Sequence, residues 1–326
     1  MLTPEFWRTD NGLSRLLEPV GQLYGAVTAW RIAHTEPEPL TVPLICVGNL
    51  VAGGAGKTPV ALALCQRVRA LGLAIRPHFL LRGYGGTDPG PTLVDLVRHG
   101  FRQVGDEALL LAQAGATLVA RDRRAGAKAA ITAGADLILM DDGHQNPSLA
   151  KDLSIVVIEG AFGFGNQRLL PAGPLRESPE RGLARAGAVV ILGVDRTGVA
   201  EMIPEGLPRL GARLVPDEAA LALAGRKVVA FAGIGRPEKF FDTVRAVGGN
   251  LLARHPFADH YPYAEADIQP ILDEAFALGA VPVTTAKDAV RLSPDQRQQV
   301  SVLGVSVVWE DEAAIDSLLR RVCQHG

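Results

Sequence analysis

The segment 42–73 constrains the fold most, because an apolar strand, a glycine-rich loop and a helix follow one another there without interruption. Residues 42–50 (VPLICVGNL) are predicted to form a buried strand. Residues 58–73 are predicted to form a helix, in which Pro59 suits the first turn. The glycines between these elements let backbone N–H groups surround an anion at the N-terminus of the helix. The segment therefore predicts a phosphate-binding loop.

Strands and helices continue to alternate after this segment. Residues 123–135 are predicted to form a helix, and the further strands are expected at 116–120, 136–142, 153–159 and 187–195. This order is typical of a parallel sheet with crossover helices. The composition agrees with an α/β fold, since 48% of the residues are hydrophobic and only 5% are aromatic.

The alternation stops in the segment 204–224, which contains Pro204 and Pro208, and this break predicts a domain boundary. Residues 1–215 are expected to form a P-loop NTPase-type parallel sheet domain. Residues 216–326 are expected to form a smaller α/β domain that closes over the active site. Its predicted elements are a strand at 226–235, a helix that begins at Pro237, and strands at 280–288 and 305–311.

Charge, cysteine content and hydropathy exclude several classes of protein. The net charge is −2 and the sequence pI is about 6.4, so no basic surface for nucleic acid is expected. Three cysteines without metal-binding spacing argue against a disulfide framework and suit a reducing cytoplasm. No signal peptide and no apolar run of about 20 residues is found, so no membrane-spanning segment is predicted. No obligate protein partner is indicated.

Residues 12–33 are predicted to form an amphipathic N-terminal helix, which Pro19 is expected to kink or interrupt. Its apolar positions are Leu13, Leu16, Leu17, Val20, Leu23, Tyr24, Ala26, Val27 and Trp30. Two interpretations remain open. The apolar side packs on the protein core, or it lies in a membrane interface with its aromatic and arginine side chains at headgroup level.

The phosphate loop departs from the general pattern G-x-x-x-x-G-K-[ST], because Val51 replaces its first glycine. Lys57 would reach the β- and γ-phosphates of a nucleotide, and the Thr58 hydroxyl would bind Mg²⁺. The alternative is a glycine-rich turn that is followed by lysine and threonine by chance. The predicted nucleotide-binding residues are Gly53, Gly54, Ala55, Gly56, Lys57 and Thr58.

Acidic residues supply candidates for metal binding and for a general base. Asp141 and Asp142 end a predicted buried strand, where one carboxylate could bind Mg²⁺, although a solvated strand end is the alternative. Asp106 and Glu107 begin a predicted helix, which they could simply cap. A carboxylate there could instead meet His260, from the loop 255–263 of the second domain, and form a base when the domains close.

Two glycine- and proline-rich loops carry further candidates. The loop 82–91 contains Arg82 and Tyr84, and the loop 163–179 contains Arg168 and Arg176. These arginines could neutralise a transferring phosphate or bind an anionic group of the substrate, or they could be surface charges.

Taken together, these segments resemble one family, the tetraacyldisaccharide 4′-kinases (lipid A 4′-kinases). The resemblance covers about residues 13–292 and depends on the motifs CVGNLVAGGAGKTP, RGYGG, VGDEALLLA, RDR, DDGHQ, GFGNQRLLPAGPLRE, AGIGRPEKFF, FADHY and AKDAVRL. It implies transfer of the ATP γ-phosphate to the 4′-hydroxyl of a tetraacylated glucosamine disaccharide 1-phosphate, with Mg²⁺ as cofactor. Loss of the glycine at Val51 is then a family trait.

The resemblance also implies roles for individual residues. Lys57 and Thr58 would bind ATP and Mg²⁺, and Asp106 would be the base, assisted by His260. The other matching positions are Asp141, Asp142, Gln145 and Arg176, with Glu107 and Tyr84 as auxiliary candidates. The N-terminal helix would touch the inner membrane, which implies a peripheral protein on its cytoplasmic face in a Gram-negative bacterium. His144, Lys151 and Tyr261 differ from the residues that many members have at these positions.

Two other functions compete with the kinase. A P-loop GTPase or metallochaperone-type switch should carry an N/T-K-x-D motif, but in the segment 284–288 (TTAKD) Lys287 and Asp288 are adjacent, so the aspartate has the wrong spacing. An ATP-dependent membrane-partitioning protein would hydrolyse ATP without depending on a lipid acceptor.

Overall fold

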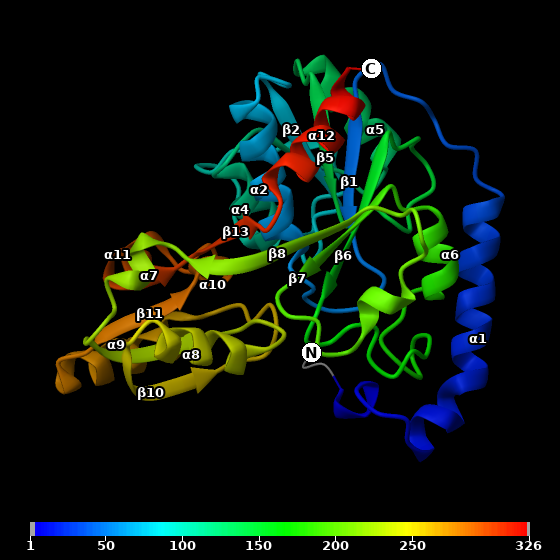
Figure 1. Cartoon of the computed structure of the whole chain (residues 1–326). Helices are drawn as coiled ribbons and strands as arrows, with labels where there is room; N and C mark the ends of the chain where they lie inside the picture. Colours follow the sequence, from blue (N-terminus) through cyan, green and yellow to red (C-terminus); the bar gives the residue numbers. More distant parts are fainter. Residues whose placement is uncertain (1–3, 325–326) are drawn as a thin grey trace.

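The computed structural model describes residues 4–324, which form two sheets of different size, each covered by helices (Figure 1). The larger sheet has nine strands in the order β13-β8-β7-β6-β1-β5-β2-β4-β3. Its strands are β1 (Leu44–Gly48), β2 (Pro77–Leu81), β3 (Thr92–Leu93), β4 (Thr117–Val119), β5 (Leu137–Asp141), β6 (Leu153–Glu159), β7 (Ala188–Leu192), β8 (Arg209–Pro216) and β13 (Val305–Trp309). All neighbours pair in parallel except β3 with β4 and β13 with β8. The predicted α/β fold with a parallel sheet is confirmed.

The helices lie in the connections between strands. Their bounds are η1 (Glu5–Trp7), α1 (Gly12–Ala33), α2 (Lys57–Ala70), α3 (Phe101–Val104), α4 (Asp106–Ala112), α5 (Arg123–Thr132), α6 (Pro179–Ala184), η2 (Val199–Met202), α7 (Glu218–Leu221), α8 (Pro237–Ala246), α9 (Glu265–Leu278), α10 (Ala286–Ala289), α11 (Pro294–Gln299) and α12 (Glu312–Cys323).

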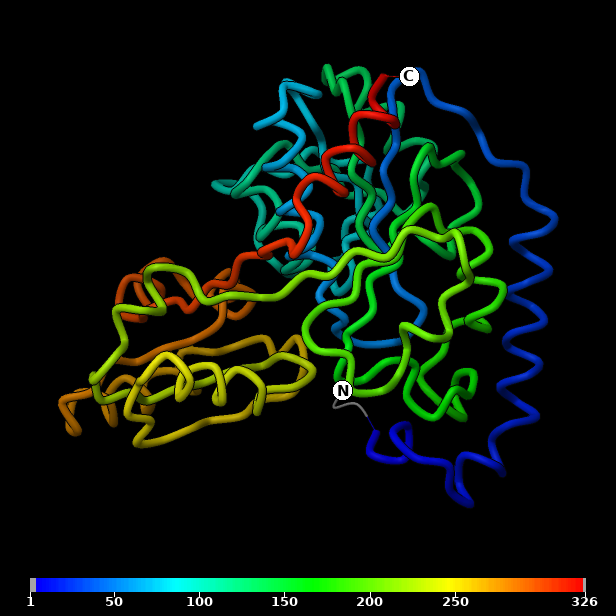
Figure 2. Tube along the Cα trace, in the orientation of Figure 1, coloured from blue at the N-terminus to red at the C-terminus, as the bar shows by residue number. Residues whose placement is uncertain are grey.

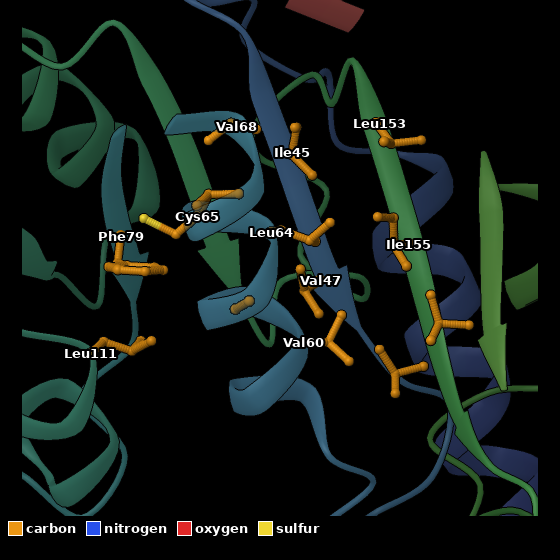
Figure 3. Close-up of a cluster of buried hydrophobic side chains, with 14 of the residues drawn as sticks. Ile45, Val47, Val60, Leu64, Cys65, Val68, Phe79, Leu111, Leu153 and Ile155 are labelled. Carbon is orange, nitrogen blue, oxygen red and sulfur yellow. The ribbon is translucent and has the colours of Figure 1, made fainter. Parts of the chain in front are cut away.

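The core of the larger sheet fixes the phosphate loop in place. One side of α2 packs through Val60 and Leu64 on the strand residues Ile45 and Val47 (Figure 3). A fully buried leucine or valine stabilises the fold by about 1.5–3 kcal/mol, so this contact anchors the loop that joins β1 to α2. In the parallel register Val47 lies opposite Asp141, so the carboxyl ends of β1 and β5 meet at one edge of the sheet.

The smaller sheet consists of four parallel strands in the order β10-β9-β11-β12. Their bounds are β9 (Lys227–Ala232), β10 (Asn250–Pro256), β11 (Val281–Thr285) and β12 (Ser301–Leu303). Alternate residues of β9 face opposite sides, as the period of a strand requires. Val228 and Ala230 pack in one cluster with Phe241 of α8, whereas Val229 and Phe231 pack in another with side chains of α9.

The chain passes between the two sheets at the ends of β8 and β13, both of which belong to the larger sheet. The prediction had instead assigned all of residues 216–326 to the smaller domain. The chain leaves the larger sheet at the end of β8 and returns to it through β13, which pairs with β8 (Figure 2). Trp309 then joins the core of the larger sheet, where α12 contributes Ile315 and Leu319. The strand at 305–311 was predicted, but its assignment to the smaller domain was wrong, because the local pattern does not specify which sheet a strand joins.

Helix α1 runs without a break through Pro19, so the predicted interruption did not occur. Pro19 is exposed, and the backbone carbonyl that its missing N–H leaves without a partner can therefore bind water. The helix packs on the protein through small residues. Ser14, Gly21 and Thr28 are buried, and a Cβ atom at Gly21 would lie 2.8 Å from the Leu169 carbonyl oxygen.

The apolar side of α1 faces outward. Leu16, Leu23 and Trp30 have exposed fractions of 74%, 66% and 64%. The predicted amphipathic stripe therefore exists, but it is the small and polar side of the helix that meets the protein. Among residues 4–324, no helix combines the length and the apolar character that crossing a bilayer requires.

Candidate active site

The phosphate loop joins β1 to α2 with a backbone that requires glycine at two positions. Gly53 has a φ of 109° and Gly56 a φ of 83°, and both values lie in the region that favours glycine. A Cβ atom at Gly56 would also lie 2.4 Å from a methyl carbon of Leu192. The Ala55 side chain is buried in an apolar cluster, so this residue can reach a phosphate only through its backbone. The free N–H groups at the start of the 14-residue helix α2 favour an anion there.

Asp141, at the end of β5, lies against the first turn of α2. The Thr58 hydroxyl donates to Asp141 Oδ2 at 3.0 Å, whereas Asp141 Oδ1 is buried and has no hydrogen-bond partner. Burial raises the pKa of Asp141 to about 7, assisted by the charge of Glu107 and opposed by Lys57. A buried carboxylate oxygen without a partner, next to a threonine hydroxyl, is a donor set that suits Mg²⁺.

Asp142 has a different environment, although it is the next residue. It adopts a φ of 54°, which turns its side chain toward two cations. Arg176 Nη1 lies 2.7 Å and Lys57 Nζ 3.6 Å from Asp142 Oδ1. Burial favours the neutral acid, but Lys57 and Arg176 outweigh it and hold the pKa of Asp142 below its usual range. The two adjacent acids are therefore distinguished by their partners.

The loop 163–179 is fastened to this edge of the sheet. Gln145 Nε2 donates to the Asn49 carbonyl at 2.8 Å and to Glu177 Oε1 at 2.9 Å. Arg185 donates to both Glu177 oxygens at 2.7 Å. These contacts hold Arg176 in position over Asp142.

His144 belongs to a buried structural network. Its Nε2–H donates to the Gly182 carbonyl at 2.9 Å, and its Nδ1 accepts from the Ser154 hydroxyl at 2.7 Å. Burial lowers the pKa of His144 to about 4, so the ring is neutral at pH 7.

Asp106 and His260 meet across the boundary between the two parts of the protein. His260 Nδ1 donates to Asp106 Oδ2 at 2.9 Å, and Asp106 Oδ1 accepts from the Glu107 backbone N–H at 2.8 Å. Burial would raise the pKa of Asp106, but the hydrogen bond from His260 and the charges of Lys287 and Arg291 hold it below its usual value. The sequence alone left open whether these two side chains approach each other.

Other side chains surround this pair. The Tyr84 ring lies 5.3 Å from the His260 ring and is mostly exposed. Lys287 Nζ lies 3.3 Å from both His260 Nε2 and Glu107 Oε1. Lys287 can therefore donate to the ring nitrogen that Asp106 does not use, which fixes the tautomer of a neutral His260.

A second contact between the two parts lies at the phosphate loop. Arg236 Nη2 donates to the Gly54 carbonyl at 3.0 Å and forms an ion pair with Glu159 at the end of β6. Lys239 Nζ lies 3.0 Å from the same carboxylate, and the Arg236 guanidinium lies 5.6 Å from the centre of the Phe162 ring. The part of the protein that contains the smaller sheet therefore contacts the phosphate loop as well as Asp106.

Several of these residues were not identified from the sequence. Lys287 and Arg291 lie in the motif AKDAVRL, and Arg236 lies in AGIGRPEKFF, but neither motif indicates which distant side chain it meets. Arg123, in the motif RDR, is buried, and its Nε has no partner. The only sequence signal that could have identified these residues is that each is a basic residue within a motif of the family.

Two other side chains from the loops discussed above lie outside the site. His255 Nε2 lies 2.6 Å from Glu274 Oε2, on the smaller sheet and α9. Arg168 forms ion pairs with Asp10, just before helix α1, and with Glu18 within it. These pairs attach the loop 163–179 to the N-terminal helix. Of the interpretations left open for Arg168, these ion pairs with protein carboxylates favour a structural charge over binding of a phosphate.

Comparisons with known proteins point to one family. The family model LpxK, described as tetraacyldisaccharide-1-P 4′-kinase, matches residues 13–324. The tetraacyldisaccharide 4′-kinase of Rhodospirillum rubrum is 60% identical over 326 residues, with 99% of this chain and 98% of the relative covered. That of Paramagnetospirillum magneticum is 54% identical over 323 residues, with 99% of each covered.

A solved structure is similar over nearly the whole chain. It is LpxK from Aquifex aeolicus in complex with ATP, with a TM-score of 0.74, 25% sequence identity, and coverage of 95% of this chain and 99% of that one. The match to the family model over residues 13–324 and the identity to relatives of full length establish the family. The chain therefore belongs to the tetraacyldisaccharide-1-phosphate 4′-kinase family.

Proposed function

We propose that this protein is an ATP-dependent kinase that transfers the γ-phosphate of ATP to the 4′-hydroxyl of a tetraacylated glucosamine disaccharide 1-phosphate, a step in lipid A biosynthesis. The observation that carries the proposal is the 2.9 Å contact between Asp106 and His260, next to a phosphate loop in a chain of this family. A hydroxyl acceptor requires such a base, whereas simple nucleotide binding does not.

ATP would bind with its phosphates over residues 53–58. The loop backbone would donate to the phosphate oxygens, and Lys57 would leave Asp142 to contact the β- and γ-phosphates. Thr58 and Asp141 fit Mg²⁺, because Asp141 Oδ1 is buried without a partner beside the threonine hydroxyl. Bound there, the cation would neutralise charge on the phosphates.

Asp106 would act as the general base. As the acceptor oxygen bonds to the γ-phosphorus and the bond from the γ-phosphorus to the ADP oxygen breaks, the hydroxyl proton passes to the Asp106 carboxylate. His260 orients this carboxylate through its Nδ1–H. Closure of the smaller domain over the acceptor would exclude water from the transferring phosphate.

Substrate contacts would come from the side chains around these groups. Arg176 sits on Asp142 and is held by the Gln145 and Glu177 network, so it can bind an anionic group of the acceptor or the transferring phosphate. Tyr84 is exposed beside His260, where a sugar ring could approach. Glu107 keeps Lys287 near the base.

The N-terminal helix would attach the enzyme to the cytoplasmic face of the inner membrane. Its outward apolar side chains suit insertion at a lipid surface. A lipid acceptor resides in such a surface, so the attachment would bring the kinase to its substrate.

The GTPase alternative loses its structural basis. Asp288 is fully buried and accepts from the Gly233 N–H and the Tyr263 hydroxyl, and Lys287 faces His260. Neither side chain is free to recognise a guanine base.

The test is mass detection of a phosphorylated acyl disaccharide after incubation with Mg·ATP in detergent. The proposal predicts product with ATP and ADP release that depends on the acceptor. Faster turnover with GTP, or ATP hydrolysis that is independent of the lipid, would contradict it.

A further inference from the structure

Arg291 lies between the two sheets, just after α10, and its side chain is 1% exposed. Its Nη2 donates to the Gly233 carbonyl at 3.0 Å and lies 3.1 Å from Asp288 Oδ1. Its Nη1 donates to the Tyr261 carbonyl at 3.1 Å. These partners all belong to the smaller part of the protein, which therefore holds the guanidinium in a fixed orientation.

The remaining nitrogen lies between the two parts of the protein. Arg291 Nε donates to the Lys287 carbonyl at 3.3 Å and also lies 3.2 Å from Asp106 Oδ2, the oxygen that accepts from His260. Asp106 is itself 3% exposed, so water does little to stabilise its charge. A buried carboxylate needs a close cation or several donors to stay ionised. Arg291 supplies such a cation from the opposite side of the domain boundary.

Ionisable groups surround Asp106 on its own helix, on α10 with the turn after it, and on the loop after β10. They are Glu107, Asp259, His260, Lys287, Asp288 and Arg291. Two of the acids already have cationic partners, since Glu107 pairs with Lys287 and Asp288 pairs with Arg291. Arg291 forms the ion pair with Asp106, at 3.2 Å, while the charges of Lys287 and His260 lower the pKa of Asp106 more than that of Arg291 does.

We infer that Arg291 is a positioning residue for phosphoryl transfer, which keeps Asp106 ionised and correctly oriented when the smaller domain meets the larger one. The inference rests on the proposed role of Asp106 as the base. Arg291 exchanges no proton, because the proton of the acceptor hydroxyl passes to Asp106. The base is then complete only when both domains are in contact, which limits chemistry to the closed arrangement.

The experiment is the pH dependence of kcat/KM for acceptor phosphorylation by the full chain in detergent with Mg·ATP. It compares the wild type with Arg291→Gln, Arg291→Lys and Asp106→Asn. Arg254→Gln is the matched control, because Arg254 pairs with Glu238 on an exposed face of the smaller domain. Folding of each variant is checked by near-UV circular dichroism.

The inference predicts that Arg291→Gln lowers kcat/KM more at low pH than at high pH. Loss of a close opposite charge raises the pKa of a buried carboxyl group by about 1–3 units. The ratio of wild-type to variant kcat/KM should therefore be about 10-fold larger near pH 5.5 than near pH 8.5. Arg291→Lys should show a smaller pH-dependent change because it retains the charge, and Arg254→Gln should follow the wild type.

A purely structural role predicts a defect that is the same at every pH, and that result would overturn the inference. If Arg291→Gln does not fold, the double variant Asp288→Asn/Arg291→Gln removes both buried charges within the smaller domain. It should show the same pH-dependent defect, whereas Asp288→Asn alone should not. Wild-type turnover by Asp106→Asn would instead refute the base itself, so the two failures are distinguishable.

Discussion

The Thr58 hydroxyl donates to Asp141 at 3.0 Å, which joins the first turn of the helix after the phosphate loop to the end of the neighbouring strand. The parallel register of β1 and β5 makes this contact possible, because it places Val47 opposite Asp141. The next acid, Asp142, is already neutralised by Lys57 and Arg176. The two acids therefore differ in their capacity to bind a metal.

This difference predicts that Asp141→Asn impairs Mg²⁺ use. Removing the charge of a metal ligand should lower kcat/KM by about 100-fold or more and raise the Mg²⁺ concentration needed for half-maximal activity. EDTA should abolish wild-type activity, and added Mg²⁺ should restore it. Asp273→Asn, on the exposed side of α9, is the matched control. A normal Mg²⁺ titration by Asp141→Asn would contradict the assignment.

Buried His144 predicts a loss of stability in acid. Its pKa is about 4 in the folded protein and 6.5 in the unfolded chain, so the unfolded chain takes up the proton first as the pH falls. The contribution of this residue is complete above pH 6.5 and is lost as the pH falls toward 4.

His144→Gln, which cannot gain this charge, should therefore show a shallower fall in the free energy of unfolding over that range. Between pH 6.5 and pH 4, the two proteins should differ in this fall of the unfolding free energy by a few kcal/mol in total. Urea unfolding at several pH values measures it. Parallel pH profiles for the two proteins would show that His144 is not held neutral by burial.

The two sides of α1 predict separable effects on membrane binding and on stability. Replacing Leu16, Leu23 and Trp30 with serine should reduce co-sedimentation with anionic phospholipid vesicles and leave the melting temperature near that of the wild type. Gly21→Val should do the reverse, because its side chain would meet Leu169 at the packed surface. Undiminished vesicle binding by the triple variant would exclude the outer side of α1 as the membrane contact.

The sequence predicted those parts of the site that depend on local order. A strand that runs into glycines, lysine and threonine predicts the phosphate loop wherever it lies in the fold. A buried strand that ends in two acids predicts the position of Asp141 and Asp142, because the carboxyl ends of parallel strands share one edge.

Features that depend on distant partners could not be predicted in the same way. The strand at 305–311 was recognised by its apolar residues, but pairing with β8 is a non-local property. Arg291 lies in a motif that was recognised, yet nothing near it in the chain indicates that it contacts Asp106. The spacing of α1 defined its apolar side but not the direction that side faces, since both a core and a membrane would bury it.

The most direct test of the account is formation of the 4′-phosphorylated product by Asp106→Asn, measured by mass spectrometry against the wild type and the half-exposed control Asp95→Asn, whose side chain lies outside the site. Removing a general base should lower kcat by about 10²–10⁴-fold, while ATP binding and folding remain near those of the wild type. Product formation by Asp106→Asn at the rate of Asp95→Asn would contradict the proposal that the contact between Asp106 and His260 activates the acceptor hydroxyl.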